Sequence, residues 1–426
     1  MNSVTVMLSV FFLFIAIGVP VAIAAGVATM LALLMQGDSL ELLADMAYTS
    51  IDNFTLVAVP CFILAGLIMQ KGGLAKQLTD LANILVGHMT GGLGLVSITA
   101  CAFFAALTGS GPATTASIGS IMVPAMKEEG YSAGYAGAIV ACSGGLGVII
   151  PPSIPLILYG VIAEVSITKL FIAGIIPGLL ITFLLAATNY IYARRVGLTT
   201  SRIKNNSVRE IWKGINNAKW AILAPVIILG GIYAGIFTPT EASVVAIFYS
   251  IAVCVFIYKS LSFQELVAAI TQTAKLTGIA FIIIYTTMVF GEVLTLHRVP
   301  QQIAESLLAV TQSKIIISTL ILVFILFMGM FMGVIPMIVL LVPILLPVVQ
   351  AIGIDPIHFG IIFVVAAEIG FETPPVGATL YIAVPIAETT IEDISKSAIW
   401  FIMAEIVGLV IVTSVPWFSL SLTSLF

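Results

Sequence analysis

The chain has 426 residues, of which 60% are hydrophobic and only 8% are charged. Soluble proteins carry about 25% charged and about 45–50% apolar residues, so a soluble globular fold is excluded, and a net charge of −4 gives no reason to expect nucleic acid as a partner. Several apolar stretches reach the ~20 residues that cross a bilayer as a helix, whereas the alternating strands of a membrane β-barrel are absent. We therefore predict an all-α polytopic membrane protein.

Charged residues predict the orientation of the chain. The apolar N-terminal run predicts a retained first span, and the segment 38–52 that follows contains acids but no Lys or Arg. Lys71 follows the second span, and the stretch 194–219 contains seven basic residues against one acid. The positive-inside rule places the basic stretch and the N-terminus in the cytoplasm and the acidic loop and the C-terminus outside.

The next feature along the chain is a polar interruption at 108–115, which separates the apolar runs 92–107 and 116–126. Each run is shorter than the ~20 residues of a full span, so we predict a re-entrant helical hairpin that turns within the membrane. The hydroxyl groups at its tip are those of Ser110, Thr114 and Thr115. They are the strongest candidates for direct contact with a substrate.

A helix break is predicted at Pro151-Pro152, within the apolar segment 132–163. Proline removes a backbone donor and clashes with the preceding turn, so the break frees carbonyl groups, which are costly at membrane depth unless they face a cavity. These carbonyls and the hydroxyl of Ser153 form an oxygen-rich site suited to Na⁺, and the half-helix that follows presents its positive end to an anion. The alternative is a simple kink.

The chain repeats itself at an offset of 223 residues. Each half contains Gly-x-x-x-Pro-Pro, and six Gly or Pro positions coincide: Pro124/Pro347, Gly130/Gly353, Gly137/Gly360, Gly147/Gly370, Pro151/Pro374 and Pro152/Pro375. The orientation above gives the two repeats opposite senses. Inverted repeats with interrupted helices are typical of secondary transporters, whose binding site lies near the bilayer midplane.

The second half carries different side chains. Its tip, 329–336, has no hydroxyl group, so ion contacts there must come from backbone carbonyls. Thr373 and Thr379 supply hydroxyls at the second break. Of the two acids in that apolar run, Glu372 is adjacent to the proposed cavity, whereas Glu368 is expected to pair with a basic group or to anchor the hairpin. The predicted substrate-binding residues are Ser110, Thr114, Thr115, Glu372 and Thr379.

The sequence also bears on other classes of function. An intramembrane protease of the Gly-x-Ser-Gly type is excluded because Thr108 stands two residues before Ser110, and the lack of a Walker motif excludes direct use of ATP. Two inverted breaks suit alternating access better than a channel. A proton-coupled antiporter remains the alternative, with Glu372 as the residue nearest to that role.

The segments 109–119, 144–155 and 370–377 resemble those of the large membrane (M, or DctM) subunit of tripartite ATP-independent periplasmic (TRAP) transporters. The resemblance implies an elevator-type importer of organic-acid anions in the bacterial inner membrane, with two re-entrant hairpins and two broken helices. It also implies two or more Na⁺ ions, a periplasmic substrate-binding protein and a small four-span membrane subunit. General likeness favours sialic acid, such as N-acetylneuraminate, as the substrate, and a C4-dicarboxylate next.

The same resemblance implies ligands and a division of the chain. One Na⁺ site would use Ser110, Gly147, Ile150 and Ser153, and the other Gly329, Gly333, Gly370, Thr373 and Val376, mainly through carbonyl groups. The expected parts are scaffold helices and an arm (1–88), the first transport half (89–165), scaffold helices with the basic loop (166–310), the second transport half (311–390) and a C-terminal span (391–426).

Overall fold

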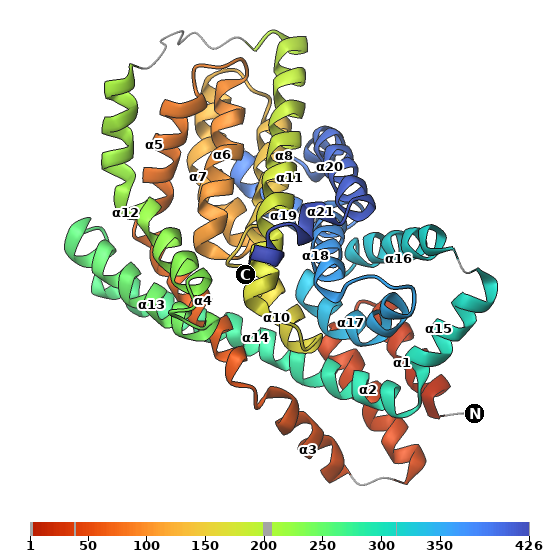
Figure 1. The fold of residues 1–426 in the computed structure, drawn as a ribbon. Helices are drawn as coiled ribbons and strands as arrows, with labels where there is room; N and C mark the ends of the chain where they lie inside the picture. Colours follow the sequence, from red (N-terminus) through yellow and green to blue (C-terminus); the bar gives the residue numbers. More distant parts are fainter. Residues whose placement is uncertain (1–2, 38–39, 199–206, 312, 426) are drawn as a thin grey trace.

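A computed structural model describes residues 3–37, 40–198, 207–311 and 313–425 (Figure 1). Every regular element in these ranges is helical, and seven helices are long and apolar enough to cross a membrane, or eight if one bent pair is a single span. The prediction of an all-helical multi-pass membrane protein is confirmed. The seven are Phe54–Lys71, Ile167–Val196, Val208–Tyr233, Pro239–Ile257, Phe263–Leu296, Val334–Ala351 and Ile391–Ser414.

The N-terminal segment corrects one prediction. It forms two helices, α1 (Ser3–Ala16) and α2 (Val21–Gln36), and not one span. The amide of Gln36 donates to the hydroxyl of Ser3 at 2.9 Å, so α2 runs back along α1. Gly18 has a φ of +83°, and the proline two residues later, at the start of α2, prevents the helix from continuing. Both ends of the pair therefore lie on one side, and the predicted crossing between them is wrong.

The two charged segments lie at opposite ends of the molecule (Figure 1). The acidic segment forms the helix α3 (Leu40–Ile51), and residues 38–39 lie outside the described ranges. Arg194 and Arg195 end the helix α11 (Ile167–Val196), and α12 (Val208–Tyr233) begins after a capping box. Residues 199–206, with Arg202 and Lys204, lie outside the described ranges. Most of the predicted basic loop is thus helical.

A framework of helices supports one side of the molecule. Its longest member, α14 (Phe263–Leu296), has 34 residues, or roughly 50 Å, and runs obliquely across the structure in contact with α2, α4 (Ala58–Lys71) and α17 (Val334–Ala351) (Figure 1). The other framework elements are α4, η1 (Phe54–Val57), α5 (Leu74–Val86), α13 (Pro239–Ile251) with its π-helical end η2 (Ala252–Ile257), and α15 (Val299–Val310).

Helix boundaries confirm the internal repeat. Adding 223 to the bounds of α7 (Gly111–Glu128) gives 334–351, the bounds of α17 (Val334–Ala351). The remaining pairs are α6 (Gly92–Thr108) with α16 (Lys314–Gly329), α8 (Ala133–Gly144) and α9 (Leu146–Ile149) with α18 (Pro356–Glu372), α10 (Ile154–Ile162) with α19 (Ala378–Ala387), and α11 with α20 (Ile391–Ser414). The short α21 (Trp417–Leu420) and η3 (Thr423–Leu425) follow. The repeat thus extends through α11, which packs on α20, α6 and α18.

Both predicted breaks are present. The axis bends by 41° between α8–α9 and α10, across the four residues 150–153, and 373–377 separate α18 from α19. The first tip is tighter than predicted, because α7 begins at Gly111 and takes Thr114 and Thr115 into its first turns. In the second half, α17 is long enough to cross a membrane, so the re-entrant form of the hairpins stays a prediction.

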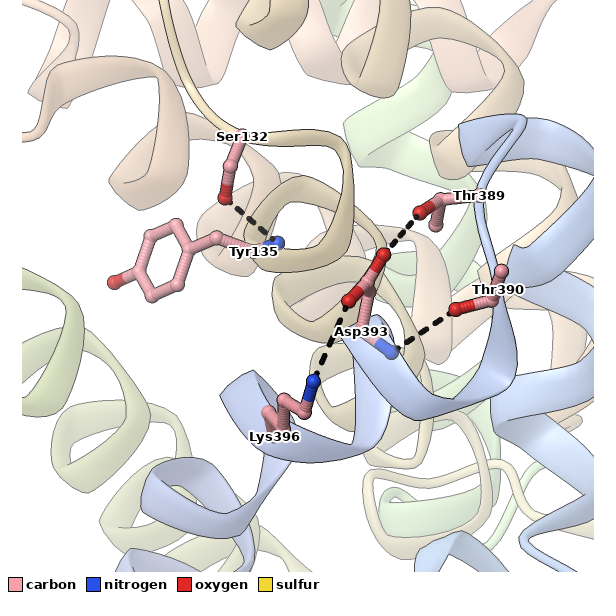
Figure 2. Close-up of polar contacts among 6 residues, drawn as sticks. All are labelled: Ser132, Tyr135, Thr389, Thr390, Asp393 and Lys396. Atoms are coloured by element: carbon pink, nitrogen blue, oxygen red, sulfur yellow. Dashed lines mark hydrogen bonds and ion pairs between the residues drawn. The ribbon is translucent and has the colours of Figure 1, made fainter.

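The N-termini of α8 and α20 lie side by side (Figure 2). Ser132 caps α8 by accepting from the N–H of Tyr135 at 3.3 Å, and Thr390 caps α20 by accepting from the N–H of Asp393 at 3.3 Å. A Cβ atom on Gly134 would lie 2.7 Å from the carbonyl oxygen of Asp393, so glycine permits this approach. The two repeats are thus joined along α8 and α20.

Candidate functional site

The first hairpin tip docks on the first break. The N–H of Ile154 donates to the carbonyl oxygen of Gly109 at 3.2 Å, and Gly109 has a φ of +60°. A Cβ atom on Gly147 would lie 2.5 Å from the carbonyl oxygen of Ser110, so only glycine fits there. Two regions more than 35 residues apart in the chain are therefore held together by backbone contacts, and the predicted ligands Ser110, Gly147 and Ser153 share one neighbourhood.

Hydroxyl groups line this junction. Thr114 donates to the carbonyl oxygen of Ser110 at 2.9 Å, and its hydroxyl is also 2.9 Å from that of Thr108. Ser153 donates to the carbonyl oxygen of Val148 at 2.5 Å and caps α10 by accepting from the N–H of Leu156 at 3.3 Å. A hydroxyl oxygen has two acceptor positions, so Ser153 retains one for a cation. Oxygen donors of this kind suit a hard ion such as Na⁺.

The second break has a similar backbone. A Cβ atom on Gly370 would lie 2.6 Å from the carbonyl oxygen of Leu326 and 2.7 Å from the Cα of Gly329. The hydroxyl of Thr373 donates to the carbonyl oxygen of Ile369 at 2.5 Å. The predicted ligands Gly329, Gly370 and Thr373 thus lie together. Of the other two predicted ligands, Gly333 is the N-cap residue of α17 and Val376 is exposed. Ile150, predicted for the first site, ends α9 at its break.

A cavity of about 290 Å³ lies between the two hairpin tips and the framework helices α4 and α14. Ser110 and Pro112 line it from the first tip, Gly333 and Pro336 from the second, and Glu368 from α18. We call this space the central cavity. Of the predicted substrate-binding residues, only Ser110 lines it. The others, Thr114, Thr115, Glu372 and Thr379, are fully buried outside its lining.

The surroundings of Glu368 and Glu372 differ from those that the sequence predicts. Neither carboxylate oxygen of Glu368 has a hydrogen-bond partner among the described residues. The ion pairs formed within the described ranges, Lys127–Glu388 and Lys396–Asp393, do not involve it. The expected pairing of Glu368 with a basic group is therefore wrong. Sequence reasoning also missed Cys142 and Glu405, whose ligand atoms lie within 4.8 Å of those of Glu372. A sequence feature that could have identified Glu405 is that it is the one acid in the apolar run 397–414.

An ion pair links α7 of the first repeat to the end of α19 of the second. The Nζ of Lys127, at the end of α7, lies 2.8 Å from the carboxylate of Glu388 and donates to the carbonyl oxygen of Ala387 at 3.2 Å. The hydrogen bond and the charge of Lys127 lower the pKa of Glu388. The side chain of Lys127 is partly exposed and that of Glu388 is largely exposed, so the ion pair contributes little to the stability of the contact between the first hairpin and α19.

Comparison with known proteins places the chain in a family. Residues 8–418 match the DctM component of tripartite ATP-independent periplasmic transporters. The isethionate TRAP permease DctMQ of Oleidesulfovibrio alaskensis is 42% identical over 97% of this chain, which spans 65% of that relative. The C4-dicarboxylate permease DctM of Pseudomonas aeruginosa is 39% identical over 92% of this chain and 91% of the relative. The sialic acid permease SiaM of Vibrio cholerae is 34% identical, with 92% of each chain covered.

The fold has a solved counterpart. The crystal structure of the YdaH transporter from Alcanivorax borkumensis matches with a TM-score of 0.61 over 90% of this chain and 89% of that chain, at 14% sequence identity. At this identity the likeness concerns the fold alone. The sequence relatives are transport permeases and not enzymes. The two repeats, the paired breaks and the match over nearly the whole length lead to one conclusion: the chain belongs to the DctM family, the large permease subunits of TRAP transporters.

Proposed function

We propose that this chain is the large permease of a Na⁺-driven importer of organic-acid anions. The observation that carries the proposal is the pair of symmetry-related breaks, each with a hydroxyl group 2.5 Å from a carbonyl oxygen at the helix end. Each break offers carbonyl and hydroxyl oxygens to a cation, and the helix after the second break, α19, presents its N-terminus to an anion. One Na⁺ at each break would provide the positive charge that an anionic substrate requires.

The central cavity is the proposed substrate site. It lies where both hairpin tips meet the framework, and among its described lining residues there is no Lys or Arg. The anion would therefore be held by neutral donors, such as the hydroxyl of Ser110 and the N–H of Gly111 at the start of α7, together with bound Na⁺. Such a site binds weakly on its own, so selectivity would reside largely in a partner protein.

The partners and the substrate class follow from the family. We propose that a periplasmic binding protein delivers the substrate and that a small membrane subunit supports the permease in the bacterial inner membrane. Relatives are named for isethionate, C4-dicarboxylates, sialic acid and 2,3-diketo-L-gulonate, all of which are organic anions. An elevator motion of the repeated elements along the framework would carry the anion across, and Na⁺ bound at both breaks would drive it inward.

Reconstituted transport tests the proposal. The permease, its small membrane subunit and its binding protein are placed in liposomes, and uptake of isethionate, a C4-dicarboxylate and N-acetylneuraminate is measured with and without an inward Na⁺ gradient. We expect uptake of at least one anion only with Na⁺. Uptake of an anion that is equally fast without Na⁺, or unchanged Na⁺ dependence in both Ser110→Ala and Thr373→Val, would show that the assigned ion sites are wrong.

A further inference from the structure

A second cavity lies beside the second hairpin, apart from the central cavity. It has a volume of about 430 Å³, and its lining residues lie within 8–12 of α1, 290–294 of α14, 299–303 of α15, 320–328 of α16 and 340–345 of α17. These helices lie together at the end of the molecule that contains the start of α1 (Figure 1). We call this space the lateral cavity. The described linings of the two cavities have no residue in common.

The lining of the lateral cavity is entirely apolar over the described residues. All 15 lining side chains are those of Leu, Ile, Val, Phe or Met. The rings of Phe11 and Phe290, with centroids 4.8 Å apart, join α1 to α14 at this lining. A cavity of this kind stays free of water and takes up apolar molecules, because water inside it would have no hydrogen-bond partner. The ligand that fits the lateral cavity is therefore apolar.

The lateral cavity opens on a surface that faces the bilayer. Phe12, Leu320 and Phe324 line it and are nevertheless 53%, 51% and 40% exposed, so they form its rim. Leu341 and Leu345 are only 4% and 6% exposed and form its inner wall. Two of the lining helices, α14 and α17, are long and apolar enough to cross a membrane, so the cavity lies at membrane depth. The apolar molecule available there is the acyl chain of a lipid.

The lateral cavity extends from the membrane interface towards the second tip. Val299 lines it one residue after Arg298, and Arg298 follows the end of α14, where that helix leaves the membrane. Along α16 the lining runs from Leu320 to Met328, which is the residue before Gly329 of the second tip. These eight steps cover roughly 12 Å of helix. An acyl chain takes the same course, from its headgroup towards the centre of the bilayer.

A basic group stands at the interfacial end of the lateral cavity. Arg298 is exposed, and the ion pairs formed within the described ranges do not involve it. A guanidinium group binds phosphate through paired, charge-assisted hydrogen bonds. A phospholipid joins a phosphate to an acyl chain. Its two parts therefore match the two neighbouring features, the basic group and the apolar space.

We propose that the lateral cavity binds one acyl chain of a phospholipid whose phosphate pairs with Arg298. Lipid chains are as apolar as the lining, so the gain comes from the atomic contacts that an unfilled space would lack, and not from the hydrophobic effect. The bound chain lies between α14 of the framework and the second hairpin, α16 and α17. It fills the space between them without making a hydrogen bond to either. The site uses none of the predicted Na⁺ ligands and does not rest on the proposed function.

Photo-crosslinking in lipid nanodiscs tests the proposal. The full-length permease, in complex with its small membrane subunit, is placed in nanodiscs containing a phosphatidylglycerol with a diazirine group midway along one acyl chain, and mass spectrometry identifies the labelled residues. We expect about tenfold more label on Leu341 and Leu345 than on Phe183 and Phe248, because about ten additional carbon contacts correspond to such a preference. Phe183 on α11 and Phe248 on α13 are 68% and 69% exposed and line none of the described cavities, so they report ordinary contact with the bilayer.

Two tryptophan variants sharpen the test. Leu341→Trp fills the cavity from its inner wall and should reduce the label on Leu345 about tenfold, with the label on Phe248 unchanged. Val323→Trp is the matched control, because Val323 is a 58% exposed residue of α16 outside the described lining, and it should change neither. Arg298→Gln removes the charge at the interfacial end and should lower the label on Leu345 about two- to fivefold.

Two results would overturn the proposal. One is a wild-type protein in which Leu341 and Leu345 carry no more label than Phe183 and Phe248, which is also the result expected if the small membrane subunit filled the cavity. The other is equal labelling of Leu345 in Leu341→Trp and in the wild type. The wild-type experiment needs no variant, so it remains decisive even if a substitution prevents folding. It also needs no transport, so the result is independent of whether uptake is driven by Na⁺.

Discussion

The two halves of the repeat share a backbone but differ in chemistry. At the first break Ser153 is fully buried and the docked tip carries Thr108, Ser110 and Thr114, whereas the second break exposes Val376 to 41% and its tip has no hydroxyl group. The boundaries of α7 and α17 nevertheless coincide after the shift of 223 residues. Glycine and proline thus determine where the helices end. The side chains at those ends have diverged, because carbonyl groups are supplied by the backbone in either half.

The largest expected effect comes from adding one methyl group at either equivalent glycine. Gly147→Ala would place Cβ 2.5 Å from a backbone oxygen of Ser110, and Gly370→Ala would place it 2.6 Å from that of Leu326. Backbone atoms cannot relieve such a clash by changing rotamer as a side chain can, so the unfolding free energy of each variant should be lower by about 1–3 kcal/mol. Thermal unfolding of the purified protein measures this loss. Similar losses at both sites would confirm that the backbones are equivalent.

The matched control is Gly278→Ala on α14. Nothing lies within 4 Å of a Cβ atom at Gly278. Alanine is favoured over glycine in a helix by about 0.5–1 kcal/mol, so this variant should be as stable as the wild type or slightly more stable. If Gly147→Ala unfolded at the same temperature as Gly278→Ala, the tight contact between the first tip and the first break would be refuted.

Next in size is the contrast between the two break hydroxyls. Ser153→Ala removes both the bond to the Val148 carbonyl and the cap of α10, at a cost of about 1 kcal/mol, and Thr373→Val removes one oxygen at a half-buried position. We expect the Na⁺ concentration for half-maximal uptake to rise about tenfold in the first variant and less in the second. Thr319→Val, which removes an exposed hydroxyl from α16, should leave it unchanged. A larger rise in Thr373→Val than in Ser153→Ala would contradict the expectation that the hydroxyl at the first break contributes more to Na⁺ binding.

A smaller effect is expected from Thr108→Val at the first tip. The variant removes the 2.9 Å contact with Thr114, while Thr114 still donates to Ser110. The loss in unfolding free energy should be about 0.5–1.5 kcal/mol. The second tip carries Phe331 at the equivalent place and has no such bond. Unfolding at the wild-type temperature would mean that this hydrogen bond adds nothing to the stability of the first tip.

The smallest effect concerns Lys127 and Glu388. Lys127 lowers the pKa of Glu388 below its ordinary value of 4.5, so the pair stabilises the fold above that value and its contribution is lost as the pH falls through the lowered pKa. Lys127→Met should therefore be slightly less stable than the wild type at neutral pH, and the difference should shrink in acid to the contribution of the hydrogen bond from Lys127 to the carbonyl oxygen of Ala387. Added salt should also reduce the difference. A difference as large in acid as at neutral pH would show that the ion pair adds nothing to stability.

Much of the repeated half of the fold could be predicted from Gly and Pro positions, because these residues constrain the backbone wherever they occur. The breaks at Pro151-Pro152 and Pro374-Pro375 follow from that, whereas the proximity of Ser110 to Gly147 was expected only from the resemblance to TRAP permeases. The fold-back of α2 along α1 could not be predicted from the sequence. The length of an apolar run can be read from the sequence, but the direction in which the chain leaves that run cannot. The burial of Thr115 and the lack of a partner for Glu368 depend on which helix faces pack together, which is a property of the tertiary structure.

The wall that α4 and α14 present to the central cavity consists of glycine and apolar side chains: Ile63, Gly66, Leu67, Leu276, Ile279, Ala280 and Ile283. Such side chains make no directional bonds, so their contact energy varies little as the opposing surface is displaced. The residues that α14 contributes to the wall lie within one continuous helix, Phe263–Leu296. In the elevator motion proposed above, a tip that slides along this wall would break no hydrogen bond with it. Under that motion, a single polar substitution in the wall would add a hydrogen-bonding group at which the moving tip could be held.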